Sequence, residues 1–228
     1  MNKELQKRIL TSILLISLII LCLYIGHPVI VFTIFLVSCI AFNEFQKLLD
    51  AAYPLSSVQK FLTLILALFY FLFIFFISSA SLAYDNVYIF ILALSICVFS
   101  DIGGFIVGKI IKGPKLTKIS PNKTISGSVG SVLFSFIPLI ILNYFFPENF
   151  LLSKSNIIFC FEITVVCQLG DLFISFFKRK AKVKDTGKIL PGHGGLLDRI
   201  DGIIFALPYA YNNIYGINSY LKISILNF

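Results

Sequence analysis

Long apolar runs occupy most of this sequence, and they exclude a soluble domain built around a single buried core. Hydrophobic residues make up 58% of the 228 residues, whereas charged residues make up only 13%. A helix of roughly 20 apolar residues can cross a bilayer. We therefore expect an all-α, polytopic integral membrane protein with about seven transmembrane helices, and six or eight are the alternatives. The predicted spans are residues 9–25, 29–42, 61–77, 88–108, 129–146, 157–177 and 203–220.

The second span and the segment that follows it allow more than one assignment. Residues 29–42 are short for a full crossing, so a tilted or re-entrant segment is an alternative there. For residues 43–60, between the second and third spans, we expect a short amphipathic cytoplasmic helix. The remaining spans are long enough for a full crossing.

The basic residues provide an independent test of the span count. Seven spans place the amino terminus and residues 43–60, 109–128 and 178–202 on one side, and of the 19 Lys and Arg only Lys154 and Lys222 then fall on the other side. The positive-inside rule assigns the basic side to the cytoplasm. The expected protein is one transmembrane domain, residues 1–228, in the cytoplasmic membrane, with substrate loops at 109–128 and 178–202. Anionic lipid and phosphate ligands explain the net charge of +8, so no nucleic acid is expected as a partner.

Small residues in the apolar runs predict packing. The five cysteines all lie in such runs, where a small buried hydrophobe is the expected role. Residues 103–109, GGFIVGK, match the glycines and lysine of a phosphate-binding loop, but Ile110 replaces the required Ser or Thr and no strand precedes the motif. We expect Gly104 and Gly108 to allow close approach of a neighbouring helix.

Carboxylates within predicted spans indicate a functional site. Asp101 and Asp171 each lie about 10–12 Å below the cytoplasmic end of their helices, at 1.5 Å rise per residue. Asp198 and Asp201 open the last span from the same side, with Arg199 between them. A water-filled cavity open to the cytoplasm would accommodate all four carboxylates, whose hard oxygens suit Mg²⁺. For Asp198 and Asp201, ordinary helix capping is the competing explanation.

Helical spacing supports a role for Asp171. Gln168, Asp171, Ser175 and Lys178 fall at i, i+3, i+7 and i+10, which forms a polar stripe along one helix face. Glu162 lies on the opposite face, close to the outer boundary, where packing or partial exposure explains it without a functional role.

Two polar segments carry groups suited to phosphate. The loop 109–128 combines its lysines with hydroxyl and amide side chains at Ser120, Asn122, Lys123 and Thr124. The turn at residues 191–195, PGHGG, lets the backbone approach a phosphate closely because glycine adopts conformations that other residues avoid. We expect His193 to hydrogen-bond or position a ligand, and a purely structural role in the loop is the alternative.

The polar residues match a family signature. Residues 175–201 contain S-x-x-K-R followed by K-D-x-G-x-x-L-P-G-H-G-G-x-x-D-R-x-D, which resembles the signature of phosphatidate cytidylyltransferases, also called CDP-diacylglycerol synthases. Ser100-Asp101-x-Gly103 and the block at residues 120–124, SPNKT, are similar to two further family patterns. The resemblance covers the chain from about residue 100 onward, and the first three spans match only as hydrophobic segments.

The resemblance implies a polytopic transferase that joins CTP to phosphatidate and gives CDP-diacylglycerol and pyrophosphate with Mg²⁺. It implies Asp171 and Asp198 as the first metal ligands, followed by Asp101 and Asp201, and leaves a second cation and a homodimer open. The implied substrate-binding residues are Ser120, Asn122, Lys123, Thr124, Ser175, Lys178, Arg179, Lys184, Asp185, His193, Gly194, Gly195 and Arg199.

The sequence departs from the family pattern at two places. Ile125-Ser126 stands where the family often has Trp-Glu, and Ile102 stands where Thr is common. Two other functional classes fit the same composition. One is a transporter of an anionic solute, although neither repeat symmetry nor broken helices are evident. The other is a related membrane enzyme, such as a lipid or polyprenol kinase or a cytidylyltransferase acting on a different phospholipid.

Overall fold

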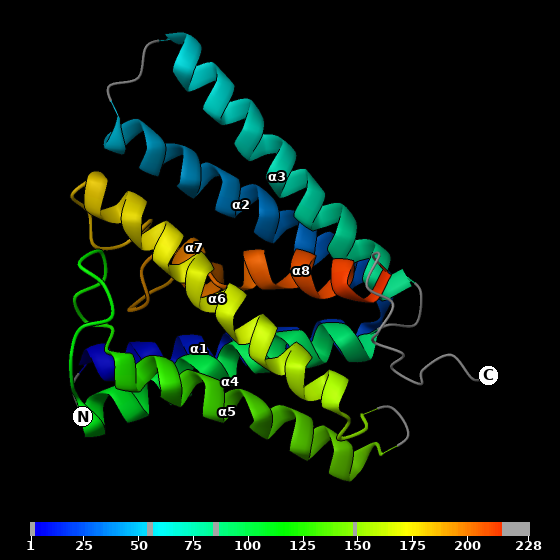
Figure 1. Ribbon diagram of the computed structural model, residues 1–228. Helices are drawn as coiled ribbons and strands as arrows, with labels where there is room; N and C mark the ends of the chain where they lie inside the picture. The colour runs from blue at the N-terminus through cyan, green and yellow to red at the C-terminus, as the bar shows by residue number, and fades with distance from the viewer. Residues whose placement is uncertain (1–2, 54–56, 84–86, 148–149, 216–228) are drawn as a thin grey trace. The chain divides into compact units, whose positions relative to one another are not determined.

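All regular secondary structure is helical in the part that the computed structural model describes, which comprises residues 3–53, 57–83, 87–147 and 150–215. Within those residues there is no strand, and two isolated β-bridges, Lys115 with Thr124 and Leu190 with Gly194, pin loops. The predicted all-α class is confirmed. The helices are α1 (Lys3–Ile25), α2 (His27–Ala52), α3 (Ser57–Ala83), α4 (Val87–Ile111), α5 (Ile125–Phe145), α6 (Lys154–Lys180), α7 (Leu197–Ile200) and α8 (Ile203–Tyr215) (Figure 1).

The predicted spans coincide with helices, and the chain is a multi-pass membrane protein. Within the described residues, four helices are long and apolar enough to cross a membrane: Pro28–Ala52, Ile89–Ile111, Ile125–Phe145 and Lys154–Lys180. Shorter apolar helices cover Leu10–Cys22 and Phe61–Phe76. The predicted end of the last span, residues 216–220, lies outside the described residues. The total of seven spans stays a prediction.

The segment 43–60 differs from its expected structure. In place of a separate short helix, α2 continues from the apolar run to Ala52 and has 26 residues. Ala41, Leu48 and Leu49 are buried along this continuation. Apolar residues at helical spacing therefore extend the helix, and the short run 29–42 belongs to an element of full crossing length.

Packing divides the chain into two compact units, and each is described by itself. The first comprises residues 1–83 and 176–201, where α2 packs against α1, α3 and α7. The second comprises residues 84–175 and 202–228, where α4 packs along α5 and against α8. Both units are discontinuous in sequence, because α6 begins in the second unit and ends in the first. The prediction of a single transmembrane domain is left untested.

Glycines bring α4 and α5 together. A Cβ atom at Gly103 would lie 2.5 Å from the Gly130 carbonyl oxygen, and one at Gly108 would lie 3.0 Å from Thr124 Oγ1. At Gly104 it would lie 2.6 Å from Ser131 Oγ. The predicted packing role of Gly104 and Gly108 is confirmed, and the residues that resembled a phosphate-binding loop form part of α4.

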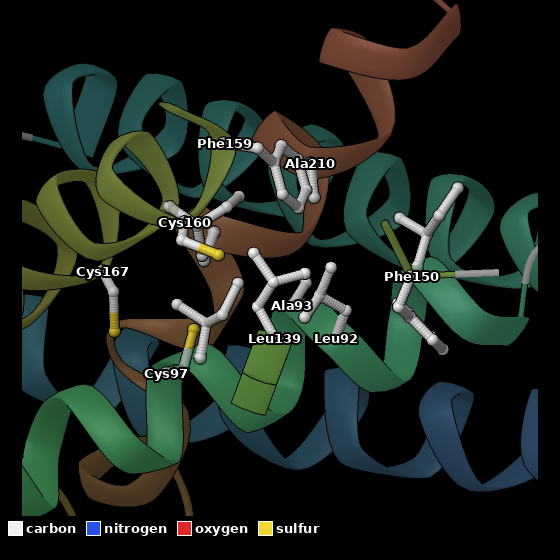
Figure 2. Close-up of a cluster of buried hydrophobic side chains, with 13 residues drawn as sticks. Leu92, Ala93, Cys97, Leu139, Phe150, Phe159, Cys160, Cys167 and Ala210 are labelled. Atoms are coloured by element: carbon white, nitrogen blue, oxygen red, sulfur yellow. The ribbon is translucent and has the colours of Figure 1, made fainter. Parts of the chain in front are cut away.

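The core of the second unit draws residues from α4, α5, α6 and α8, together with Phe150 (Figure 2). Phe159, Cys160 and Ile163 of α6 are fully buried in it, as are Ala93 of α4 and Ala206 of α8. The small residues allow the helices to approach closely.

The cysteines behave as expected with one exception. Cys22, Cys97, Cys160 and Cys167 are buried free thiols, which confirms their role as small hydrophobes. Cys39 is exposed, so the prediction of burial was wrong there. It lies two residues before the buried Ala41, which places it on a different face of α2.

Candidate functional site

The glycine-rich segment of the first unit forms a closed turn. The Leu190 N–H donates to the Gly194 carbonyl at 2.9 Å, and the His193 and Gly194 N–H groups donate back to the Leu190 carbonyl at 3.0 and 3.1 Å. Gly192 and Gly194 have φ values of 76° and 87°. These lie in the left-handed region that glycine adopts without strain. The predicted turn at 191–195 is therefore confirmed as a feature of the backbone.

Asp198 is the centre of this segment. Its Oδ1 accepts from Lys178 Nζ at 2.8 Å. Its Oδ2 accepts from the Thr186 and Gly195 N–H groups at 2.7 and 3.0 Å and lies 3.1 Å from Thr186 Oγ1. The two side chains of the ion pair are only 15% and 6% exposed, for Lys178 and Asp198 respectively. The carboxylate thus fastens the loop to the end of α6. The N-cap residue of α7 is Leu196 and Asp198 lies inside the helix, so the expectation that Asp198 is an ordinary N-cap was wrong.

Asp198 and Asp201 were expected to open the last span, and that placement was wrong. Asp198 lies in the separate four-residue helix α7, Asp201 follows it as the C-cap residue, and α8 begins only at Ile203. The separation falls at Gly202, where a Cβ atom would lie 2.8 Å from the Cys167 carbonyl oxygen. Gly202 therefore permits a close packing contact just before α8.

Glu44 of α2 was not identified from the sequence. Glu44 is only 3% exposed, and its carboxylate faces three hydrogen-bond donors of the signature loop. Oε1 accepts from the Leu196 N–H at 3.1 Å, whereas Oε2 accepts from the Leu197 N–H at 2.8 Å and from Thr186 Oγ1 at 3.0 Å. A signal existed in the sequence, since Glu44 shares a helix face with the apolar Ala41 and Leu48, where a carboxylate is expensive to bury without partners.

The second unit contains a second lysine–aspartate pair. Lys123 Nζ forms an ion pair with Asp171 Oδ2, and Ser175 Oγ donates to Asp171 Oδ1 at 3.2 Å. The Lys123 and Asp171 side chains are 27% and 24% exposed. Gln168, one turn earlier on α6, accepts from Ser128 Oγ. The predicted stripe on α6 is therefore a row of polar contacts.

The loop between α4 and α5 is held mainly by its own backbone and hydroxyl groups. Thr124 is the N-cap of α5, and its Oγ1 accepts from the Gly127 N–H at 3.0 Å. The Ser120 carbonyl accepts from the Lys123 N–H at 3.0 Å. Asn122 is exposed. Ser120 and Thr124 thus shape the loop, and phosphate binding by Ser120, Asn122, Lys123 and Thr124 stays a prediction.

The remaining predicted residues border the glycine turn or lie at the surface. Arg199 Nη2 donates to the His193 carbonyl at 3.0 Å, and His193 Nε2 lies 3.4 Å from Ser12 Oγ. The exposed residues among them are Arg199, Asp101 on α4, Arg179 on the last turn of α6, and Lys184 and Asp185 in the loop.

The four predicted metal ligands fall in different parts of the structure. Asp101 and Asp171 belong to the second unit, and Asp198 and Asp201 to the first. The convergence of the four carboxylates therefore stays a prediction. Among the residues that the structure describes, no three His, Cys, Asp or Glu side chains gather as a metal-binding group. Mg²⁺ commonly uses only one or two carboxylates together with water and substrate phosphates. The hard oxygens of Asp171 and Asp198 therefore fit this ion.

Comparison with known proteins identifies relatives of the chain. It is 40% identical over 134 residues to the phosphatidate cytidylyltransferase of Rickettsia bellii (strain RML369-C), a match that covers 55% of this chain and 56% of that protein. It is 41% identical over 144 residues to that of Rickettsia typhi (strain ATCC VR-144 / Wilmington), with 58% and 59% covered. For that of Staphylococcus haemolyticus (strain JCSC1435), the identity is 40% over 129 residues, with 54% and 48% covered.

The matches to these curated relatives span about half of their length. The model of the cytidylyltransferase family matches residues 52–215, which include both basic loops and every predicted site residue. That match covers well over half of the sequence. The chain belongs to the cytidylyltransferase family.

Proposed function

We propose that this protein is a phosphatidate cytidylyltransferase that converts CTP and phosphatidate to CDP-diacylglycerol and pyrophosphate. The observation that carries the proposal is the folded signature, in which Lys178, Asp198 and the glycine turn form one closed structure. Family membership and the names of the relatives support the same activity.

In the proposed reaction, a phosphate oxygen of phosphatidate attacks the α-phosphorus of CTP. A new phosphorus–oxygen bond forms, the bond between the α-phosphorus and the bridging oxygen breaks, and pyrophosphate leaves with that electron pair. The attacking phosphate is already anionic near neutral pH, so the protein needs no strong general base. Catalysis then depends on holding two polyanions together and on stabilising the charge of the leaving group.

The basic residues of the two loops supply much of that stabilisation. Lys178 and Lys123 are both within ion-pairing distance of an aspartate, so their ammonium groups are held in place before substrate arrives. Arg179 and Lys184 are exposed and would contact phosphate oxygens in the proposed complex. Preorganised cations offset the repulsion between the reactants without reorganisation during the reaction.

We also propose that the reaction uses Mg²⁺, for which Asp171 and Asp198 are the first candidate ligands and Asp101 and Asp201 the next. A bound Mg²⁺ would supply Lewis-acid stabilisation of phosphate charge. The protein would lie in the inner membrane with its basic loops on the cytoplasmic side, in keeping with the distribution of Lys and Arg.

The test is an assay of the purified full chain in detergent with CTP and phosphatidate, with and without Mg²⁺. We expect equal amounts of pyrophosphate and CDP-diacylglycerol, formed only with CTP and Mg²⁺. Consumption of ATP with phosphorylation of a lipid or polyprenol would replace this proposal with a kinase. Uptake of an anionic solute into sealed vesicles without nucleotide would replace it with a transporter.

A further inference from the structure

Glu44 is a buried carboxylate that belongs to no part of the signature, and it lies before the family match at residues 52–215. It is in the first unit together with the signature loop, so the contacts between them lie within one unit. Its partners are 142, 152 and 153 positions away in the sequence. A carboxylate in such a place is destabilising unless donors surround it.

Two of those donors are backbone N–H groups at the start of α7. Leu196, the N-cap residue of α7, makes no side-chain cap hydrogen bond. The two oxygens of Glu44 instead accept from the consecutive N–H groups of Leu196 and Leu197. Glu44 therefore provides the cap of α7 from a distant helix, and only a carboxylate or another two-acceptor group of the same length can serve both donors.

The loop is shaped to receive this carboxylate. A Cβ atom added to Gly195 would lie 2.5 Å from Glu44 Oε2, and one added to Gly187 would lie 2.8 Å from Glu44 Cδ. Any side chain at either position would displace the carboxylate. These two glycines of the signature thus make room for Glu44 as well as giving the backbone its freedom.

Thr186 connects Glu44 to Asp198. Its hydroxyl oxygen lies 3.0 Å from Glu44 Oε2 and 3.1 Å from Asp198 Oδ2. A hydroxyl group has one proton to donate, so with both carboxylates ionised it serves one of them at a time. Asp198 keeps the Thr186 and Gly195 N–H groups and Lys178 in either case. A chain of direct contacts therefore runs from α2 through Thr186 to the Asp198–Lys178 pair.

We propose that Glu44 is a positioning residue of the transferase site, which fixes the signature loop so that Asp198 holds Lys178 in place for the substrate phosphates. This inference rests on the proposed function for its catalytic consequence, and the loop contacts themselves are independent of that function. A displacement of about 1 Å in a positioning group can reduce a rate by a factor of about 100.

The experiment compares Glu44→Gln with Glu162→Gln in the purified full chain. Glu162 is the matched control, because its Oε2 also accepts a hydrogen bond within the helices, from Asn213 Nδ2 at 2.7 Å, but in the other unit. One readout is kcat and KM for both substrates, measured on folded protein isolated by size exclusion. The second is the rate of tryptic cleavage after the exposed Lys182, Lys184 and Lys188.

We expect Glu44→Gln to lower kcat at least tenfold with KM changed less than about threefold, and to speed tryptic cleavage of the loop. Glu162→Gln should leave both readouts unchanged. Thr186→Val should reproduce the kcat loss in weaker form, and Thr186→Ser should restore it because the hydroxyl is retained. Normal kcat per folded molecule in Glu44→Gln would overturn the proposal, as would a kcat loss with unchanged loop cleavage.

The two proposals fail in different ways. If the wild-type protein makes no CDP-diacylglycerol, the proposed function fails, and faster cleavage of the loop in Glu44→Gln still supports the anchoring role. If the wild-type protein is active and Glu44→Gln matches it in both readouts, only the inference about Glu44 fails.

Discussion

Asp198 and Asp171 have the same side chain and each pairs with a lysine, yet their surroundings differ. Asp198 has contacts to Lys178, to two backbone N–H groups and to the Thr186 hydroxyl, and its side chain is 6% exposed. Asp171 has contacts to Lys123 and Ser175, and its side chain is 24% exposed. The first aspartate organises a loop, and the second stays accessible. The two aspartates were expected to be equivalent metal ligands, but their structural roles differ.

The two lysine–aspartate pairs differ in how far water reaches them, and this changes what each contributes to stability. Breaking a buried ion pair leaves an uncompensated charge and costs about 3–5 kcal/mol, whereas an exposed pair contributes about 0–1 kcal/mol. Three substitutions and one treatment compare the Asp198 and Asp171 regions. Each is expected to change the free energy of unfolding by a different amount, and each also affects activity.

Asp198→Asn should have the largest effect. The amide oxygen can replace Oδ2 toward the backbone donors, but the amide nitrogen then faces Lys178 Nζ, so a buried cation loses its partner. We expect a loss of about 3 kcal/mol in unfolding free energy and no detectable CDP-diacylglycerol. Thermal unfolding followed by size exclusion and CTP-dependent labelling of lipid measure the two effects. Wild-type stability would show that the carboxylate is not the centre of the loop.

Gly194→Ala should come next, with Gly113→Ala as its control in the other loop. Both glycines have positive φ, of 87° and 113°. A Cβ atom at Gly194 would lie 3.0 Å from Asp198 Oδ2, whereas at Gly113 the nearest contact is Ser126 Oγ at 3.8 Å. Backbone strain alone costs about 1–2 kcal/mol in each. Only Gly194→Ala should also reduce activity, and equal activity losses in the two variants would contradict the distinction between the loops.

Asp171→Asn should separate activity from stability. We expect loss of CDP-diacylglycerol synthesis, because the proposed metal ligand is removed, with a stability loss of at most about 1 kcal/mol. The assay and the unfolding measurement are those used for Asp198→Asn. A stability loss as large as that of Asp198→Asn would mean that the partial exposure of the Lys123–Asp171 pair does not lower its contribution.

Chelation of divalent cations should have the smallest effect on stability. EDTA should abolish synthesis, and added Mg²⁺ should restore it. The melting temperature should change little, because Asp198 and Asp171 are both paired with lysines in the structure. Activity that persists in EDTA would refute the proposed role of Mg²⁺.

Local patterns in the sequence predicted much of this architecture. Apolar length placed every span on a helix, because membrane helices need long apolar runs. Spacing at i, i+3, i+7 and i+10 predicted the polar face of α6, on which Asp171 and Ser175 are in contact. The close packing of α4 and α5 followed from small residues at Gly104 and Gly108.

Contacts between distant segments could not be predicted in the same way. Glu44 accepts a hydrogen bond from Thr186, which is 142 positions away, and no local sequence pattern connects the two residues. The close contact between Gly202, which lies between α7 and α8, and Cys167 also joins positions far apart in the sequence. The aspartates of the candidate site were identified by residue type, but their different burial depends on neighbours contributed by the fold.

The distance in sequence between Glu44 and its donors has a consequence for biosynthesis. A ribosome makes the chain from its amino terminus, so α2 is completed about 140 residues before Thr186, Leu196 and Leu197 exist. Throughout that interval the carboxylate has none of these donors and must rely on water or lipid head groups. The hydrogen bonds that surround the buried Glu44 carboxylate can therefore form only after the loop has been synthesised.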